Sequence, residues 1–148
     1  MKLLALSSSL FAIIGSVVSL TLPATAIGTA FFSKTTQALD LPSIANQELR
    51  LTQILVPAGQ WIINYSASPV NTGSNDAVRC YVRARETGEI LSIHATFAGT
   101  GAGASYVSTI SGVTLVNLSE PTTMVLTCTR DRNGARIYID PGAEIAAY

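Results

Sequence analysis

Short runs of alternating apolar and polar residues, separated by turn-forming residues, recur along the chain after residue 49. The clearest run is Ala77–Arg85, in which the residues on one face are Val78, Cys80, Val82 and Ala84. Successive side chains of a β-strand point to opposite faces, so this two-residue period indicates an antiparallel strand with one buried face. No long stretch after residue 30 has a helical period. The pattern therefore predicts an all-β domain.

About eight or nine strands are expected, bounded by clusters of Gly, Pro, Asn and Ser. They cover residues 49–56, 60–70, 77–85, 89–97, 106–110, 113–118, 122–130, 135–139 and 142–148. Tight hairpins are expected about Ser111-Gly112 and about Asn133-Gly134, the second because Asn-Gly tolerates the positive φ angles of a two-residue turn. Turns spaced about ten residues apart predict an antiparallel β-sandwich or barrel.

The chain has two cysteines, Cys80 and Cys128, and both fall on the apolar face of an expected strand. In an oxidising compartment such a pair is most simply one disulfide, and the alternative is two free buried thiols. The bridge would close a loop of about 50 residues, which the chain-entropy model values at roughly 4 kcal/mol. It would join strands that are either neighbours or opposed across the core.

The N-terminal segment has the pattern of a secretory signal peptide. Lys2 is followed by an uncharged, largely apolar run, Leu3–Leu22, and then by Pro23-Ala24-Thr25-Ala26, which ends in an A-x-A motif. We expect a signal helix over residues 1–26 and cleavage after Ala26, with Ala30 as the second choice. The alternative is an uncleaved membrane anchor, because the apolar stretch is long enough to span a bilayer.

Removal of residues 1–26 leaves 122 residues, enough for one modest core. The expected organisation is a signal peptide (1–26), an extended N-terminal arm (27–48) and a β-sandwich domain (49–148). Without Lys2, eight basic residues face nine acidic ones, so the net charge is −1. This charge gives no reason to expect a nucleic-acid partner, or a membrane partner after cleavage. We expect a secreted protein, either periplasmic or extracellular.

Two segments carry a family resemblance: VPAGQWIINYSASPVNTGSNDAVRCYV at residues 56–82, and TTMVLTC at residues 122–128 with a short strand after it. They resemble small secreted bacterial β-sandwich proteins with one disulfide. The wider architecture resembles the jelly roll of tumour-necrosis-factor-like and complement globular-head domains. The resemblance covers residues 50–148 and implies a jelly-roll-like sandwich and a homo-oligomer, but it carries over no functional residue. Residues 28–33 are also similar to the mature start of camelysin-type biofilm-fibre proteins.

No catalytic residue is predicted. His94 is the single histidine, and a nucleophilic hydrolase would need it as the base. Its strand places it opposite Ile93 and Ala95, at a strand surface, and no neighbouring acid or serine completes a known motif. The acids considered as a glycosidase pair are interpreted instead as turn and surface residues. They are Glu86, Glu89, Asp131 and Asp140.

No cofactor or metal site is predicted either. Two cysteines without a nearby histidine do not make a zinc site, and no D-x-D-x-D-G ladder is present for calcium. The glycine-rich loop Ala98–Ser105 joins two expected strands and lacks the Lys-Ser/Thr of a phosphate-binding loop.

The candidate ligand surface is basic and aromatic. It consists of the outward-facing residues Arg79, Tyr81, Arg83, Arg85, Arg136 and Tyr138. If their strands lie in one sheet, arginine offers paired donors to sulfate, phosphate or carboxylate, and tyrosine offers a platform for sugar rings. The expected partner is then an anionic glycan or a cell-surface molecule. The alternative is a solvated strand face on which arginine lies over tyrosine.

Three functional hypotheses follow. The first is a secreted, non-enzymatic structural or binding module that acts through the sandwich surface. The second is a fibre- or pilus-like subunit in which residues 27–48 pair with the sheet edge of a neighbouring subunit. The third is a small secreted hydrolase that uses His94.

Overall fold

The computed structural model describes residues 30–99, 106–134 and 136–148, and within them it contains twelve β-strands. The predicted signal peptide and residues 100–105 of the glycine-rich loop lie outside the described residues.

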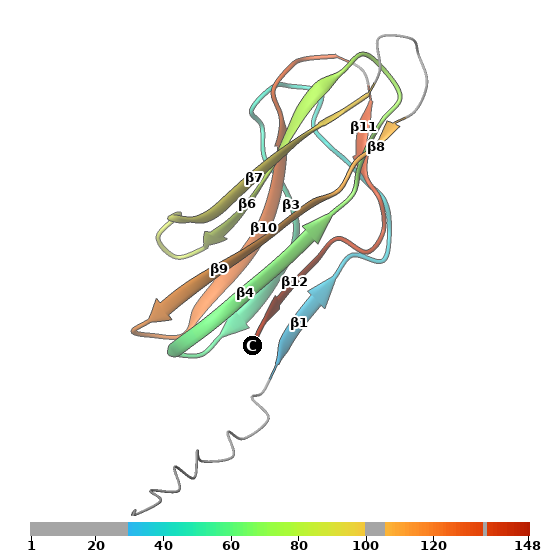
Figure 1. The fold of residues 1–148 in the computed structure, drawn as a ribbon. Coiled ribbons are helices and arrows are strands. Elements are labelled where there is room, and N and C mark those ends of the chain that lie inside the picture. Colours follow the sequence, from blue (N-terminus) through green and yellow to red (C-terminus); the bar gives the residue numbers. More distant parts are fainter. Residues whose placement is uncertain (1–29, 100–105, 135) are drawn as a thin grey trace, which may run out of the picture.

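Eight of the strands form two four-stranded antiparallel sheets that pack face to face (Figure 1). The first, called the β4 sheet here, has the order β1 (Phe31–Lys34), β12 (Glu144–Ala147), β4 (Gly59–Ala67) and β9 (Ile110–Leu118). The second, the β6 sheet, has the order β3 (Leu49–Val56), β10 (Thr122–Arg130), β6 (Asp76–Ala84) and β7 (Ile90–Ala98). The inner faces of both sheets supply the core, as alternating strands require.

Four short strands make a third, small sheet, with the order β2 (Leu39–Asp40), β11 (Ile137–Ile139), β5 (Pro69–Asn71) and β8 (Tyr106–Val107). Each lies in a connection that crosses from one large sheet to the other, and all four crossings are at the same end of the sandwich (Figure 1). The connections β3–β4 and β9–β10 cross at the opposite end. This winding is that of a jelly roll, so the predicted jelly-roll-like antiparallel β-sandwich is confirmed.

The largest fully buried side chains are aliphatic residues from both large sheets and the small one. They include Ile63, Met124, Leu126, Ile137, Ile139 and Ile145. Burial of a side chain of this size stabilises a fold by about 1.5–3 kcal/mol. The core therefore depends on strands from all parts of the described chain.

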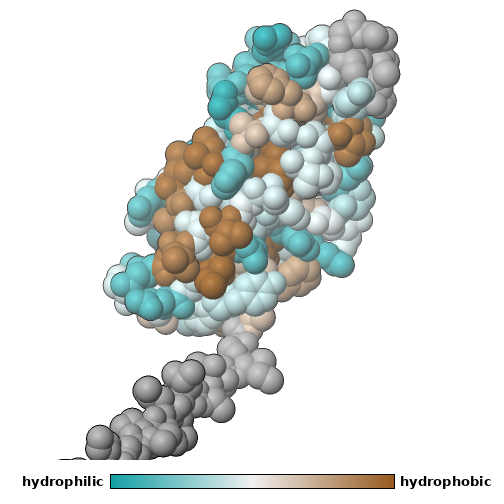
Figure 2. Space-filling model, in the orientation of Figure 1, coloured by the Kyte–Doolittle hydropathy of each residue, from teal (hydrophilic) through white to brown (hydrophobic). Residues whose placement is uncertain are grey.

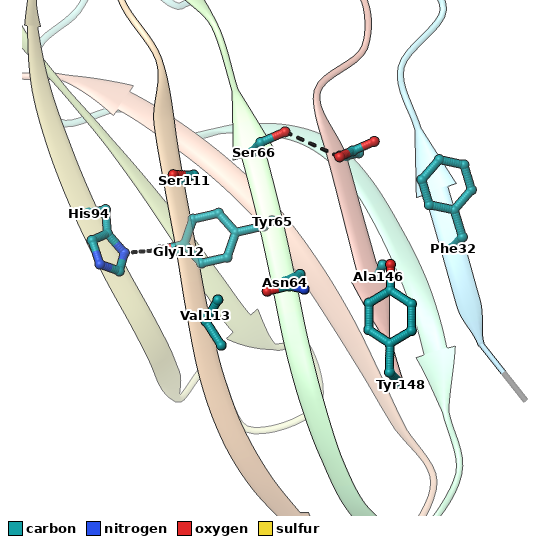
Figure 3. Close-up of a pocket in the computed structure, with 11 residues that line it drawn as sticks. Phe32, Asn64, Tyr65, Ser66, His94, Ser111, Gly112, Val113, Ala146 and Tyr148 are labelled. Carbon is teal, nitrogen blue, oxygen red and sulfur yellow. Dashed lines mark hydrogen bonds between the residues drawn. The ribbon is translucent and has the colours of Figure 1, made fainter. Parts of the chain in front are cut away.

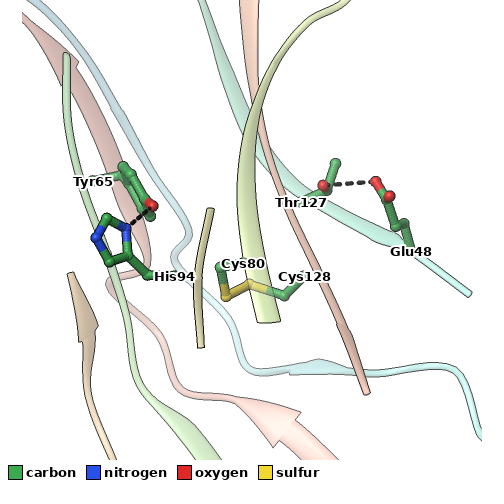
Figure 4. Close-up of a disulfide and its surroundings, with 6 residues drawn as sticks. All are labelled: Glu48, Tyr65, Cys80, His94, Thr127 and Cys128. Atoms are coloured by element: carbon green, nitrogen blue, oxygen red, sulfur yellow. Dashed lines mark hydrogen bonds between the residues drawn. A yellow bond between two sulfur atoms is a disulfide. The ribbon is translucent and has the colours of Figure 1, made fainter. Parts of the chain in front are cut away.

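The predicted disulfide is present. Cys80 on β6 lies directly opposite Cys128 on β10 in the strand register, and their Cα atoms are 4.1 Å apart (Figure 4). Both side chains are fully buried in the core. The bridge thus joins neighbouring strands of one sheet, which settles the choice that the sequence left open.

The expected N-terminal arm is corrected for its described part, residues 30–48. β1 pairs with β12 over its whole length, and β2 pairs with β11. The ring of Phe31 packs edge-on against Trp61, with centroids 5.4 Å apart, and Leu41 is buried. The described part of this segment therefore belongs to the sandwich. Strands of four and two residues are too short to show a periodicity in the sequence.

Neither predicted hairpin forms. β9 runs without interruption through Ser111 and Gly112. The chain does turn at Asn133, but β10 lies in the β6 sheet and β11 in the small sheet, so this turn joins two layers. An Asn-Gly pair specifies a turn and not the partner of the strand that follows it.

Candidate functional site

The six residues of the predicted basic and aromatic surface lie in two separate places. Arg79, Tyr81 and Arg83 project from the outer face of β6, as the alternation predicted, and Arg85 follows that strand. The other two residues, Arg136 and Tyr138, lie next to and within β11, in the small sheet. Because the strands do not share a sheet, the single continuous face does not form.

Three of these arginines form ion pairs with acids distant in the sequence. Arg79 donates two hydrogen bonds to Asp131, at 2.8 and 2.5 Å, and Arg136 donates two to Asp40, at 2.7 and 3.3 Å. Arg83 binds both carboxylate oxygens of Glu48. Each bidentate pair occupies the Nε–Nη2 edge of its guanidinium, which is one of the edges that could bind an external anion.

The ion pairs shift the pKa values of the residues that form them. The hydrogen bonds from Arg79 lower the pKa of Asp131, and the hydrogen bonds to Asp40 raise the pKa of Arg136. Two guanidinium groups also lie over tyrosine rings: Arg83 is 4.9 Å from the Tyr81 centroid, and Arg136 is 5.3 Å from the Tyr138 centroid. The arrangement matches the alternative interpretation of a solvated strand face.

A second cluster links the two large sheets around Tyr65. This side chain points inward from β4 and is 3% exposed. Its hydroxyl lies 2.5 Å from Nδ1 of His94 on β7 (Figures 3 and 4). It also lies 3.1 Å from Oγ of Ser92 on the same strand. Burial raises the pKa of Tyr65, so the hydroxyl stays protonated near neutral pH.

Gly112 makes room for this cluster. It lies opposite Tyr65 in the β4–β9 register, and a Cβ atom at this position would lie 2.5 Å from Cζ of the tyrosine ring. An aromatic ring that covers a glycine on a neighbouring edge strand compensates for the missing side chain. Gly112 is therefore in the chain for a close side-chain approach and not for a turn, which explains the wrong hairpin prediction.

The Tyr65 cluster lacks the contacts of a nucleophilic centre. In a hydrolase the base hydrogen-bonds the nucleophile and is oriented by a third group. Here Ser92 bonds Tyr65 instead of His94, and among the described residues no carboxylate bonds the imidazole. His94 itself is exposed, as predicted.

The acids considered from the sequence are dispersed. Glu86 accepts hydrogen bonds from the backbone N–H of Thr123, and Asp131 pairs with Arg79. Within residues 30–99, 106–134 and 136–148, no three His, Cys, Asp or Glu side chains gather closely enough to hold a metal ion. The same residues form no apolar helix of membrane-spanning length.

The surface that the sequence analysis missed is the outer face of the β4 sheet. A groove of about 570 Å³ crosses β1, β12, β4 and β9 and reaches His94 on β7 past Gly112 (Figure 3). Several large apolar side chains are exposed on this face: Phe32 (55%), Ile62 (44%), Val113 (64%), Leu115 (77%) and Tyr148 (57%). Figure 2 shows hydrophobic residues gathered in the region of β4, β9 and β7.

A signal for this surface was present in the sequence. In the expected strand 113–118, Val113 and Leu115 are apolar at alternate positions, and Val116 and Leu118 are apolar as well. Such a strand carries apolar side chains on both faces, although only one face can point into the core. The other apolar face is then left exposed to solvent.

Comparisons with known proteins give the class of fold. No family model and no curated protein matches the chain. The chain is similar to the solved structure of the infectious bursal disease virus Gx strain, with a TM-score of 0.51, 10% identity, and coverage of 80% of this chain and 31% of that chain. It is also similar to the crystal structure of the infectious bursal disease virus particle, with a TM-score of 0.50 and 11% identity. That similarity covers 80% of this chain and 30% of the viral chain.

The chain therefore spans about a third of the length of those viral chains. At this level of identity the similarity shows the fold alone. It agrees with the strand order in assigning a jelly-roll-like β-sandwich.

Proposed function

We propose that this protein is an exported, non-enzymatic structural or binding module that works through the outer face of the β4 sheet. The observation that carries the proposal is the set of large apolar side chains exposed on that face, from Phe32 on β1 to Leu115 on β9. Contiguous apolar surface is costly to leave in water, and it marks sites where proteins bind one another.

Two further observations support this proposal. The buried Cys80–Cys128 disulfide fits an oxidising compartment outside the cytoplasm. The hydrogen bonds of Tyr65 connect β4 to β7, and among the described residues no serine hydroxyl or carboxylate bonds His94, which favours a structural role over hydrolysis.

The observed ion pairs and strand pairs weaken two other hypotheses, the binding of an anionic glycan and the exchange of a strand between subunits. At Arg79, Arg83 and Arg136 an anionic glycan would have to compete with the acid already paired with the guanidinium. Exchange of residues 27–48 into a neighbouring subunit would require β1 to leave β12 and Phe31 to leave Trp61. A partner on the β4 sheet face would meet side chains that are already exposed among the described residues.

The test compares the native mass of freshly exported protein in three forms. We expect the wild-type chain to be found in complexes larger than the monomer, and the double variant Phe32→Ser, Val113→Ser to be a free monomer. The control is Ile44→Ser with Leu55→Ser, because these two side chains are as exposed but lie elsewhere. A wild-type chain that is always a free monomer, or a Phe32 and Val113 variant that keeps the wild-type complexes, would contradict the proposal.

A further inference from the structure

The four edge strands of the two large sheets differ in how they are protected. Unpaired edge N–H and C=O groups invite another strand, and proteins usually protect edges with charge, proline, bulges or short length. β1 has four residues and includes Lys34. β3 includes Arg50, and a register shift against β10 leaves Leu51 as the extra residue of a bulge. β7 has a similar shift against β6, at Leu91.

β9 has none of these protections. It is nine residues long, contains neither a charged residue nor a proline, and pairs with β4 from Ile110 to Leu118 without a register shift. On its inner side the hydroxyl of Thr114 donates a hydrogen bond to the carbonyl of Leu91, at 3.3 Å, which ties β9 to β7. Among the four edges, β9 is therefore the long, regular and uncharged one, and its inner side lies against β7.

The neighbouring strand β4 shows in which direction the backbone N–H and C=O groups of β9 point. Ile62 exchanges both backbone hydrogen bonds with Tyr148, so its N–H and C=O point away from β9. Leu115 lies opposite Ile62, and in an antiparallel sheet its own N–H and C=O then point to the free edge. By the two-residue period, the same holds for Ser111, Val113 and Asn117.

We propose that β9 pairs antiparallel with β9 of a second copy of this chain, about a two-fold axis at Thr114, so that two β4 sheets become one continuous sheet. The register places Val113 beside the second copy's Leu115, and Ser111 beside the second copy's Asn117. Each pair brings together residues whose N–H and C=O point to the outer edge of β9, as a hydrogen-bonded antiparallel pair requires.

The strand is self-complementary in this register. Apolar Val113 meets apolar Leu115, polar Ser111 meets polar Asn117, and no like charges are opposed because β9 has none. A two-fold contact of this kind uses the same patch on both copies and closes on itself, which gives a discrete dimer. This inference rests on the proposed function, because it names a second copy as the partner of the β4 sheet.

The experiment measures the dissociation constant of the dimer by sedimentation of the purified, exported chain over a range of concentrations. The test variant is Val113→Lys with Leu115→Lys, which places like charges opposite each other across the two-fold axis. We expect the dissociation constant to rise more than about tenfold. The matched control is Leu55→Lys on β3, a similarly exposed leucine, which should leave the constant unchanged.

Hydrogen exchange distinguishes edge pairing from contact between sheet faces, because face contact would not slow the exchange of the outward-pointing amide protons of β9. In wild-type protein, the amide protons of Val113 and Leu115 should exchange more slowly as the concentration rises, and those of Leu55 should not. A monomer at all concentrations, an open polymer, a dimer that the lysines do not weaken, or unchanged exchange at these amides would each overturn the inference. If exported protein still forms larger complexes while the purified chain is a monomer, the inference fails and the proposed function stands.

Discussion

At position 112 the β4 sheet has no room for a side chain, because the ring of Tyr65 occupies the space beneath that strand. In the variant Gly112→Ala, the new methyl group would meet Cζ of Tyr65 at 2.5 Å, and the ring would have to leave its hydrogen bonds to His94 and Ser92. Overpacking of this kind costs about 1–3 kcal/mol.

Urea denaturation measures the loss in Gly112→Ala, and Ser111→Ala is the control, because Ser111 lies next in the strand with its side chain exposed. The control should stay within about 0.5 kcal/mol of the wild type. Equal midpoints for Gly112→Ala and the wild type would show that the Tyr65 ring does not lie against β9.

Glu48 predicts a dependence of stability on pH. Burial opposes its ionisation, but the hydrogen bonds from Arg83 and Thr127 outweigh burial and lower its pKa below the usual 4.5. A carboxyl with a lowered pKa in the folded state stabilises the fold above its ordinary pKa, and this contribution is lost as the pH falls through the folded-state value. The pair is partly exposed, so we expect about 0.5 kcal/mol from it.

The variant Glu48→Gln tests this contribution, because the amide keeps the shape of the side chain but cannot ionise. Urea midpoints at pH 6 and at pH 3 should differ more for the wild type than for Glu48→Gln. If the two proteins lose the same stability on acidification, Glu48 does not contribute to the pH dependence of stability.

At the scale of elements, β1 is the strand whose role the structure changes most. Phe31 and Phe32 are adjacent, but Phe31 packs on Trp61 and the core, whereas Phe32 is exposed on the outer face. We expect Phe31→Ala to lower the free energy of unfolding by about 2 kcal/mol, less than the 3–5 kcal/mol of a fully buried phenylalanine. Phe32→Ala should change it by less than about 0.5 kcal/mol.

Urea denaturation of the two variants makes the comparison. Because both remove the same ring from neighbouring positions, they share any effect of composition on the unfolded chain. If both variants lose the same small amount of unfolding free energy, β1 is the free arm that the sequence predicted.

β6 was predictable because nine residues of clear alternation show which face is buried, whereas Gly112 led to the division of the equally long β9 into two strands. The two-residue strand β2 was not predicted, since it is too short to show a period and is formed by its neighbour. A local pattern does not show strand partners either, which is why it was left open whether the strands of Arg83 and Arg136 share a sheet. Their acids, Asp40 and Glu48, lie in the segment interpreted as an arm, so no spacing in the sequence could reveal the ion pairs.

For the whole molecule, the jelly-roll winding makes the fold depend on contacts between distant parts of the chain. β1 pairs with β12, and β3 pairs with β10, so early strands are completed only by late ones. Such contacts carry a large loss of chain entropy on folding. The Cys80–Cys128 bridge, with a sequence separation of 48, removes part of this entropy from the unfolded state in advance.

Removal of the bridge should therefore destabilise the molecule without changing its winding. The variant Cys80→Ala, Cys128→Ala should lose up to about 4 kcal/mol, because the unfolded chain regains the freedom of the closed loop. Urea denaturation with and without a reducing agent measures the loss: the wild type should weaken under reduction, and the variant should not respond. A variant as stable as the oxidised wild type would show that the sheets hold their register without the bridge, and that the disulfide adds nothing to the stability of the sandwich.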